Sequence, residues 1–359
     1  MGMNREDIPS IFHHFSCKGT YHDHRLYGSG HIHETWLVIT TEPYAPDYIL
    51  QKINRDIFKD IPALMENICL VASHLAERSS RSLQLLMTNG NQSYYTDDQG
   101  ESWRLFAYIS DSITIDRIRN LHQACEAGRA IGNFQNLLSD LGASLRMTLP
   151  GFHDPDLRME EFRSACQQDR CNRSVAVTSE IDTADRLYYL MAPLRNEIAS
   201  HRFPLRVTHN DTKLNNILFD RNDNAICLID LDTVMPGYVL YDYGDALRTM
   251  SNTAAEDEQD LSQVRFDFHV FEAFTRGYLS EAGKFLRPEE KEWLWLAPAC
   301  MTFIIGLRFL TDHINGDRYF HIHREGHNLD RARVQFTFAG ELIRYQEQIH
   351  QYLAVKESI

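Results

Sequence analysis

One short segment of the sequence combines side chains that together could move a phosphoryl group. His209, Asp211 and Asn216 form the pattern H-x-D-x4-N between two runs of β-type residues, and Asp230 ends an apolar run shortly afterwards. Because phosphoryl transfer leaves the protein little covalent work, catalysis depends on positioning a hydroxyl and neutralising charge. One carboxylate must orient the attacking hydroxyl, while an amide and a second carboxylate hold Mg²⁺. We therefore expect Asp211 in the first role, and Asn216 and Asp230 as metal ligands.

A simpler interpretation is that the same residues only make turns or cap a short element. Each of them alone would be ambiguous. The loop between two apolar strands, the spacing and the second strand that ends in an aspartate occur together, however. This structural context favours the catalytic interpretation.

A nucleotide would need further contacts from the N-terminal part of the chain. Gly28 and Gly30 precede a predicted strand and could bring backbone N–H groups close to phosphates or to a sugar, although a G-x-G pair also makes ordinary hairpin turns. Lys52 is the candidate for the strand-borne lysine that contacts the α- and β-phosphates, with Glu66 as its partner or as part of a solvated face. Gln51 points to the opposite face of the same strand, so the register that decides between Lys52 and Gln51 stays open.

Several other acidic and histidine residues each allow two interpretations. Asp232 follows Asp230 by two residues, so a continued strand would place both on one face, where Asp232 could assist the metal or orient the loop. Asp242 and Asp245 begin a helical run and could simply be charges at a helix N-terminus. The histidine-rich stretch 321–327 lacks the spacing of a zinc site, and a surface loop explains it better.

Three motifs in this region, THNDTKLNNIL, IDLDTVMPG and YDYGDALR, carry a resemblance to a known group of proteins. They are similar to the catalytic and metal-binding region of the aminoglycoside phosphotransferase and choline kinase group, which shares the protein-kinase fold. More narrowly, they resemble the N-acetylhexosamine 1-kinases, which phosphorylate the anomeric hydroxyl of N-acetylglucosamine and N-acetylgalactosamine. Similar segments at 27–32, 48–51, 132–136 and 307–310 extend the resemblance over most of the chain. The chain departs from the pattern at Ser29 and His33, where acidic and amide side chains would be expected.

The resemblance implies a substrate, a cofactor and further site residues. ATP with Mg²⁺ would donate the phosphoryl group to a small-molecule sugar. Ala107 and Tyr108, at the expected hinge near 107–110, would contact the nucleotide. His31, Asp245 and Arg308 would contact the acceptor.

Arg308 itself allows two predictions. It follows an apolar run at 293–307, so its helix should be buried on most faces and the charge needs a partner. One prediction is a structural ion pair with Asp245 or Asp312. The other is a place in the catalytic cleft, where the guanidinium could bind the sugar or the transferred phosphoryl group, as the resemblance implies.

The elements that must position these residues divide the chain into two parts. Residues 1–108 alternate apolar and polar positions, which predicts antiparallel strands at 33–40, 48–53, 82–88, 92–96 and 102–109, with a helix inserted at 61–78. Residues 109–359 show helical periodicity at 117–139, 182–198 with a kink at Pro193, 262–282, 288–314 and 329–353. Three short strands are expected at 205–208, 216–219 and 225–229. We therefore predict an α+β fold of the bilobal protein-kinase type, with a nucleotide-binding N-lobe (1–108) and a catalytic, acceptor-binding C-lobe (109–359).

Composition narrows the classes of partner. At 359 residues the chain is too long for one ordinary core, which supports two lobes. The net charge of −14 disfavours nucleic acid as a partner, although a nucleotide can still bind locally. The seven scattered cysteines fit reduced thiols in the cytoplasm. The apolar run at 293–307 is shorter than the roughly 20 residues of a membrane span, so we expect a buried helix and no membrane partner.

The leading hypothesis is ATP- and Mg²⁺-dependent phosphorylation of a free N-acetylhexosamine at O1. A kinase of another sugar, an amino alcohol or homoserine would use the same motif. A nucleotide-binding protein without turnover would have no need of Asp211, and a magnesium-dependent hydrolase would consume ATP without an acceptor.

Overall fold

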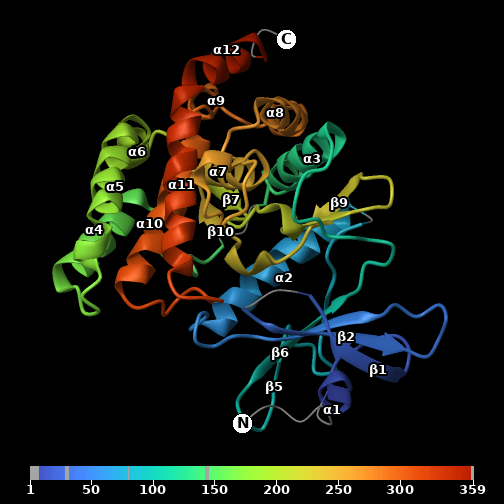
Figure 1. Cartoon of the computed structure of the whole chain (residues 1–359). Helices are drawn as coiled ribbons and strands as arrows, with labels where there is room; N and C mark the ends of the chain where they lie inside the picture. Colours follow the sequence, from blue (N-terminus) through green and yellow to red (C-terminus); the bar gives the residue numbers. More distant parts are fainter. Residues whose placement is uncertain (1–7, 29–31, 80, 142–144, 357–359) are drawn as a thin grey trace.

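A computed structural model describes residues 8–28, 32–79, 81–141 and 145–356 of the chain. A sheet-rich N-terminal part lies at one end of the molecule and a larger helical part at the other, so the first and last described helices, α1 and α12, are far apart (Figure 1). The helix α2 (Ile61–Arg78) runs between the sheet and the helices (Figure 1), and its bounds are those predicted. The predicted α+β arrangement is therefore confirmed, whereas the boundary between residues 108 and 109 stays a prediction.

The N-terminal part is one antiparallel sheet in the order β1-β2-β3-β6-β4, with β5 also paired to β6. Its strands are β1 (Tyr21–Leu26), β2 (Glu34–Thr40), β3 (Tyr48–Lys52), β4 (Leu85–Leu86), β5 (Tyr95–Thr96) and β6 (Ser102–Ala107). All five predicted strands are present, although β4 and β5 are only two residues long. The edge strand β1 was not predicted, because its sequence YHDHRL is polar and largely exposed and lacks the alternation that marks a half-buried strand.

The two faces of the sheet pack against two separate hydrophobic cores, and only one of these cores is shared with the helical part. A small core lies between the short helix α1 (Ile8–Phe12) and the outer face of the sheet. Its members are Ile8, Ile11, Phe12, Phe15, Trp36, Val38, Tyr48, Leu50, Trp103 and Leu105. On the inner side, α2 and the helical part share one continuous core. Because side chains alternate along a strand, Leu50 on the outer face requires Gln51 to point inward, toward the helical part.

The helical part contains most of the chain and four further short strands. Its helices are α3 (Leu121–Leu137), α4 (Pro155–Gln168), α5 (Thr178–Leu190), α6 (Ala192–Ala199), α7 (Val239–Met250), α8 (Phe268–Ala282), α9 (Pro288–Glu292), α10 (Ala297–Ile314), α11 (His327–Arg344) and α12 (Gln346–Lys356). The strands β7 (Arg206–Thr208) and β10 (Met235–Gly237) pair with each other, as do β8 (Ile217–Phe219) and β9 (Ala225–Leu228). Helices α4, α5 and α6 lie together beside α10 and α11 (Figure 1).

Three stretches predicted as continuous helices are each two helices. The stretch 182–198 breaks at Met191, where Pro193 begins a new helix instead of kinking one. The stretches 288–314 and 329–353 break between α9 and α10 and between α11 and α12. Hydrophobic periodicity continues through such breaks because both helices bury a face against the same core. The polar helix α4 and the strand β10 were not predicted.

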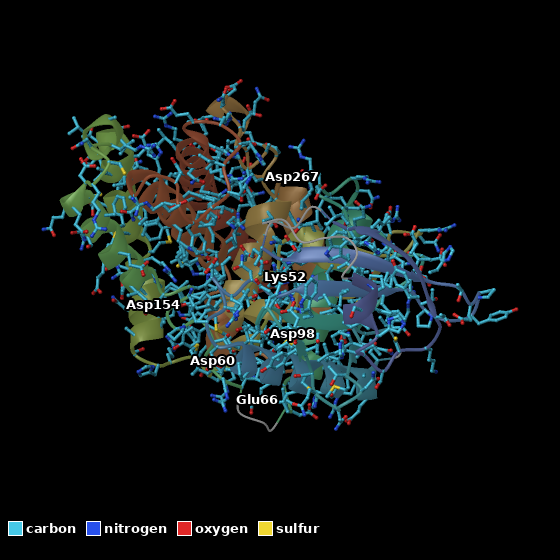
Figure 2. All side chains as sticks on the ribbon, turned by 90° about the horizontal axis from the view of Figure 1, so that it is seen from below. Lys52, Asp60, Glu66, Asp98, Asp154 and Asp267 are labelled. Atoms are coloured by element: carbon cyan, nitrogen blue, oxygen red, sulfur yellow. The ribbon has the colours of Figure 1, made fainter. Side chains whose placement is uncertain are left out.

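Aspartates begin three of these helices. Asp60 caps α2 by accepting the N–H of Ala63, and Asp154 and Asp267 cap α4 and α8 in the same way (Figure 2). Such caps satisfy N–H groups that have no partner within the helix. The Asp267 cap fixes the start of α8, which lines the pocket described below.

No helix among the described residues is long and apolar enough to cross a membrane. The apolar run at 293–307 lies mostly in α10, where nearly every side chain from Ala297 to Leu307 is buried. This agrees with the predicted buried helix.

Candidate active site

The loop between β7 and β8 is held by an aspartate from α7. Asp242 is fully buried and accepts the backbone N–H groups of His209 at 2.9 Å and Asn210 at 2.7 Å. The hydroxyl of Thr212 returns a hydrogen bond to the carbonyl of Asp242. Burial raises the pKa of the Asp242 carboxyl, while its donors favour the ionised form. Asp242 does lie in the first turn of α7, as the interpretation of a charge at a helix N-terminus expects, and it is also a buried anchor of the loop.

This anchoring presents Asp211 to a lysine and an amide. Its Oδ2 accepts from Nζ of Lys213 at 2.9 Å and from Nδ2 of Asn216 at 2.9 Å. Burial acts to raise the pKa of Asp211, but the charge and hydrogen bond of Lys213, with help from His209 and Asn216, hold it below its ordinary value. The carboxylate is therefore ionised and fixed in direction, as a residue that orients a hydroxyl must be. Sequence reasoning missed Lys213, although it lies inside the motif, two residues after Asp211.

Asp230 lies beyond the end of β9 and has an excess of negative charge around it. Its backbone is left-handed, with φ 64°, so the strand does not continue and the prediction that Asp230 and Asp232 share one strand face is wrong. Burial, followed by the nearby charges of Asp232 and Asp211, raises the pKa of the Asp230 carboxyl to about 7. A bound cation would remove this penalty.

The donor set around Asp230 suits a hard cation. Nδ2 of Asn216 donates to Asp211, which leaves the amide Oδ1 available as a ligand atom, and the N–H of Ile229, directly before Asp230, donates to the Asn216 carbonyl at 2.9 Å. No group of three or more His, Cys, Asp or Glu side chains able to hold a metal occurs among the described residues. A carboxylate and an amide that rely on phosphate oxygens and water for the remaining ligands match the way Mg²⁺ binds in nucleotide sites. The two residues therefore fit the predicted metal.

Asp232 joins the two parts of the molecule instead of assisting a metal directly. Arg104 on β6 donates from both terminal nitrogens to the Asp232 carboxylate, one of them at 2.8 Å, and Nε of Arg104 donates to Gln51 at 3.0 Å. His33 Nε2 contacts the same carboxylate, and its Nδ1 accepts the N–H of Asn54 at 3.0 Å. Burial opposes ionisation, but Arg104 and His33 hold the pKa of Asp232 far below its ordinary value. Asp232 is a buried carboxylate that connects the sheet to the loop after β9.

The predicted pair of Lys52 and Glu66 is wrong. Lys52 lies 3.5 Å from Glu101, and Glu66 pairs with Arg146 at 2.5 Å. The two predicted partners also lie apart in Figure 2. Lys52 shares the outer face of β3 with Leu50, because alternation directs Gln51 inward. On the inner face of the sheet the positively charged side chain is that of Arg104, which lies opposite Gln51 on the neighbouring strand.

The predicted nucleotide-contacting loop and hinge are partly described. Gly28 has φ 81°, a conformation that favours glycine, whereas Gly30 and His31 lie outside the described residues. The N–H groups of Ala107 and Tyr108 donate to Gln84 and Asp47, both at 2.9 Å. Backbone contacts from this hinge to a base would therefore use carbonyl oxygens.

Two tyrosines connect the glycine-bearing loop to the hinge. The rings of Tyr27 and Tyr108 meet edge to face, with centroids 5.8 Å apart. Burial, followed by a hydrogen bond with Tyr108, raises the pKa of Tyr27 to about 12. The two rings lie where the predicted glycine-bearing loop and hinge meet, which is where we expect the nucleotide to bind.

Arg308 extends from α10 into a group of aromatic rings. Its guanidinium lies 4.7 Å from the centroid of Phe152, 5.5 Å from Tyr319 and 5.4 Å from Phe320. Burial lowers the pKa of Arg308, while Tyr319 and the more distant charges of Asp211 and Asp245 act in the opposite direction.

The predicted ion pair of Arg308 with Asp245 or Asp312 is wrong. Asp245 accepts two hydrogen bonds from Arg248, at 2.9 and 2.8 Å. Asp312 accepts the backbone N–H groups of residues 318, 319 and 320. Among the described residues Arg308 has no carboxylate ion-pair partner; it donates to the Tyr319 hydroxyl at 3.3 Å, and its place in the catalytic cleft stays a prediction.

His153 lies next to the same residues and was not predicted. It is 4% exposed, and its Nε2 lies 2.9 Å from the carbonyl oxygen of Asn210, directly before Asp211. Nδ1 of His153 is buried and has no hydrogen-bond partner among the described residues. Its pKa falls to about 4, because burial disfavours the charged ring. The ring is therefore neutral at physiological pH, with Nδ1 as a hydrogen-bond acceptor.

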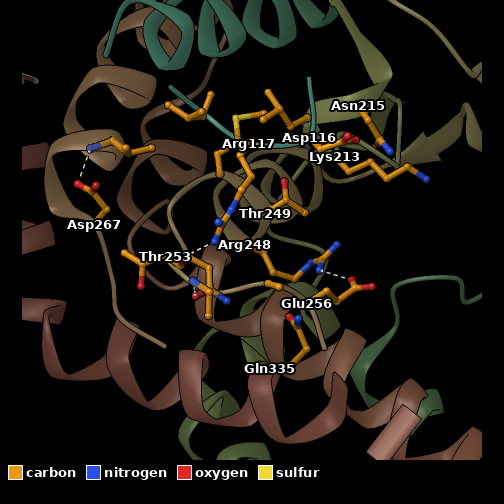
Figure 3. A pocket seen from close by; sticks show the side chains of 17 residues that line it. Asp116, Arg117, Lys213, Asn215, Arg248, Thr249, Thr253, Glu256, Asp267 and Gln335 are labelled. Carbon is orange, nitrogen blue, oxygen red and sulfur yellow. Dashed lines mark hydrogen bonds and ion pairs between the residues drawn. The ribbon is translucent and has the colours of Figure 1, made fainter. Parts of the chain in front are cut away.

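A cavity of about 650 Å³ adjoins the catalytic loop on the side of α7 (Figure 3). We call it the α7–α11 pocket. It is lined by Asp116, Arg117, Ile118, Lys213, Leu214, Asn215, Arg248, Thr249, Met250, Asn252, Thr253, Ala254, Ala255, Glu256, Asp267, Val270 and Gln335. Lys213 belongs both to this pocket and to the Asp211 contact.

Similarity to known proteins agrees with this geometry. The model of the phosphotransferase enzyme family (APH) matches residues 23–283. A microcompartment-associated aminopropanol kinase superposes with a TM-score of 0.68 at 16% identity, covering 97% of this chain and 99% of that one. An aminoglycoside phosphotransferase from Alicyclobacillus acidocaldarius gives a TM-score of 0.62 at 12% identity over 99% and 97% of the two chains. An amicoumacin kinase in complex with AMP-PNP, Ca²⁺ and its antibiotic gives 0.57 at 11% identity over 97% and 94%.

The structural similarities confirm the predicted kinase-like fold, and the family match covers the catalytic loop, Asp230 and α7. The family model and the geometry of the site both indicate phosphoryl transfer to a small molecule. The chain is therefore a small-molecule kinase that belongs to the phosphotransferase enzyme family.

Proposed function

We propose that the protein uses ATP and Mg²⁺ to phosphorylate the anomeric hydroxyl of a free N-acetylhexosamine. The observation that carries the phosphotransfer itself is the Asp211 carboxylate, fixed between Lys213 and Asn216 and next to Asp230. The motifs that resemble N-acetylhexosamine 1-kinases support the choice of sugar and of O1. The roles of the individual site residues and the cytoplasmic location remain predictions.

In the proposed reaction, Asp211 accepts a hydrogen bond from the acceptor hydroxyl and orients its oxygen toward the γ-phosphorus. A P–O bond forms to that oxygen while the bond to the β–γ bridging oxygen breaks, and ADP leaves with the electron pair. The hydroxyl proton passes to Oδ of Asp211. Lys213 balances the charge of Asp211, and its ammonium can also attract phosphate oxygens. Mg²⁺ held by Asn216 and Asp230 would neutralise charge on the phosphate oxygens.

The acceptor side favours an uncharged molecule. Arg308 has no carboxylate partner among the described residues, and Asp245 is already paired with Arg248. The positive charge of Arg308 would repel an ammonium group placed beside it. A sugar hydroxyl or acetamide oxygen could instead accept hydrogen bonds from Arg308 and donate one to Nδ1 of His153. This charge pattern supports a neutral sugar over an amino alcohol.

An amino alcohol is the second candidate acceptor, because the fold is similar to that of an aminopropanol kinase. At 16% identity that similarity extends to the fold and not to the acceptor. The nucleotide choice is supported by the complex of the amicoumacin kinase with AMP-PNP and Ca²⁺, which shows an adenine nucleotide and a divalent ion in a similar fold.

The test is an acceptor screen on the full chain with ATP and MgCl₂. Coupled ADP release is measured with N-acetylglucosamine, N-acetylgalactosamine, glucose, ethanolamine, 1-amino-2-propanol and homoserine, and ³¹P NMR locates the phosphate. We expect ADP release that requires an N-acetylhexosamine, stops with EDTA and yields the 1-phosphate. A reaction without acceptor would indicate a hydrolase. Phosphate on another hydroxyl, or a preference for an amino alcohol, would refute the proposed acceptor while leaving the kinase assignment intact.

A further inference from the structure

The α7–α11 pocket is large enough to hold a small molecule and lies beside the catalytic residues. Its volume of about 650 Å³ falls in the range of roughly 300–1,000 Å³ that is usual for small-molecule sites. Neither Asp211 nor Asp230 lines it, so the reacting hydroxyl and the metal lie outside. Lys213 is the side chain that the pocket shares with the catalytic loop. The pocket is therefore a neighbour of the reaction site and not the reaction site itself.

Charges in the pocket wall are already matched. Six ionisable side chains line it, namely Asp116, Arg117, Lys213, Arg248, Glu256 and Asp267. Three are cations and three are anions, so the lining has no net formal charge. Each cation is engaged. Arg117 donates to the carbonyl of Thr253 at 2.5 Å, and Arg248 pairs with Glu256 (Figure 3). Arg248 also pairs with Asp245, and Lys213 pairs with Asp211. An anionic ligand would have to break these contacts, and an uncharged one would not.

Two polar atoms in the wall lack a partner. Oε1 of Gln335 and Oδ1 of Asn215 are buried without a hydrogen bond among the described residues. Gln335 is only 2% exposed, and Figure 3 shows it pointing from α11 toward the pocket. A buried acceptor left unpaired costs about 1–3 kcal/mol, so both atoms favour a ligand that brings donors. Hydroxyl and amide N–H groups are such donors, and the side chains of Ile118, Met250 and Val270 offer apolar contact for C–H groups.

A second ion pair links the pocket wall to the acceptor side. Arg248 lines the pocket, and it also pairs with Asp245, whose charge acts on Arg308. The pocket and the predicted acceptor site thus share a wall made of Lys213 with Asp211 and of Arg248 with Asp245. A molecule whose hydroxyl lies at Asp211 can extend along this wall.

We propose that the α7–α11 pocket binds a second, uncharged and hydroxyl-rich portion of the acceptor, so that the enzyme accepts a reducing disaccharide as well as a single sugar. The inference rests on the proposed function, because it assumes a sugar hydroxyl at Asp211. The second ring donates hydrogen bonds to Gln335 and Asn215, and the first ring presents its anomeric hydroxyl to the catalytic loop.

The experiment compares N-acetylglucosamine with its reducing β-1,4-linked disaccharide, N,N′-diacetylchitobiose, as acceptors for the full chain. Gln335→Leu removes the pocket amide with little change in shape, and Thr249→Val removes a hydroxyl from the same wall. Gln167→Leu, an exposed amide on α4, is the matched control. We expect the disaccharide to be phosphorylated and Gln335→Leu to lower kcat/KM for it about tenfold, mainly through KM, which corresponds to one lost hydrogen bond of about 1.4 kcal/mol. Thr249→Val should lower it less, because the Thr249 hydroxyl already donates to the carbonyl of Ala246 at 3.0 Å. Activity on the monosaccharide should be unchanged in all three variants.

The possible outcomes separate this inference from the proposed function. If the monosaccharide is phosphorylated but the disaccharide neither reacts nor competes with it, only the pocket inference is overturned. If the disaccharide reacts equally well in wild type, Gln335→Leu and Thr249→Val, with melting temperatures showing all three folded, the pocket does not bind it and the inference is overturned. If neither sugar reacts while an amino alcohol does, the proposed function fails and this inference fails with it.

Discussion

Arg104 on β6 and Asp232 in the loop after β9 form a two-pronged ion pair that crosses from the sheet to the helical part, with side chains only 2% and 5% exposed. Asp232 follows Asp230 by two residues, so the pair fixes the loop that carries the proposed metal ligand. Arg104 also bonds Gln51, which occupies the inward position on β3. The cation that sequence reasoning sought on β3 is therefore supplied by the neighbouring strand.

Breaking this pair should cost more than replacing it. Arg104→Met leaves the buried Asp232 with His33 but without its two-pronged partner, and should lower the free energy of unfolding by about 3–5 kcal/mol, as urea denaturation would show. The double variant Arg104→Met/Asp232→Leu should recover most of that stability, because an apolar pair needs no desolvation. It should not recover kcat/KM, since the loop next to Asp230 loses its link to the sheet. Wild-type kinetics in the double variant would show that the pair is only structural.

Asp211→Asn and Asp230→Asn should affect different steps, turnover in the first case and nucleotide binding in the second. Asp211→Asn should lower kcat by about 10²–10⁴-fold, because it removes the proton acceptor, while affinity for Mg-AMP-PNP stays near that of the wild type. Asp230→Asn should weaken that affinity as well, since a neutral amide is a poorer ligand for Mg²⁺. Isothermal titration calorimetry separates the two. Equal losses of nucleotide affinity would contradict the assigned roles.

Arg308→Lys tests the acceptor side. Lysine keeps the charge but loses the planar group that stacks on Phe152, so kcat/KM for the acceptor should fall while the melting temperature stays close to that of the wild type. Arg195→Lys is the matched control, because Arg195 also stacks on a tyrosine, Tyr188 at 3.6 Å, but lies on α6. It should leave kcat/KM unchanged. A sharp drop in melting temperature for Arg308→Lys, with normal turnover per folded molecule, would assign Arg308 to the core.

His153 should make the folded state sensitive to acid. Its pKa falls from 6.5 to about 4 on folding, so the unfolded chain binds the extra proton and protonation favours unfolding. The stability associated with the neutral ring is complete above pH 6.5 and is lost as the pH falls toward 4, by on the order of 3 kcal/mol. Urea denaturation between pH 7 and 4 should show a shallower loss for His153→Gln than for wild type. His22→Gln, at an exposed position on β1, should follow the wild type; equal slopes for all three would contradict the buried neutral ring.

The sequence by itself determined those features whose parts are close together in the chain. Asp211 and Asn216 lie within one loop, so their spacing alone predicts a shared site, and Oδ2 of Asp211 does accept from Nδ2 of Asn216 at 2.9 Å. The alternation of β2, β3 and β6 and the periodicity of α2 likewise depend on neighbouring residues. The edge strand β1 is too exposed to leave such a pattern, and in α4 the four buried positions stand among mostly polar residues.

Only the tertiary structure decided which distant side chains meet. The choice between Gln51 and Lys52 required the strand register, because one residue reverses the face that a side chain presents. Arg104 and Asp232 are 128 residues apart, and only the packing of the sheet against the loop after β9 joins them. For Arg308 the sequence predicted burial but not the partner, since aromatic rings from two other segments surround it while Asp245 and Asp312 are satisfied elsewhere. A buried charge must find compensation, but which group compensates it depends on three-dimensional contacts that chain spacing does not encode.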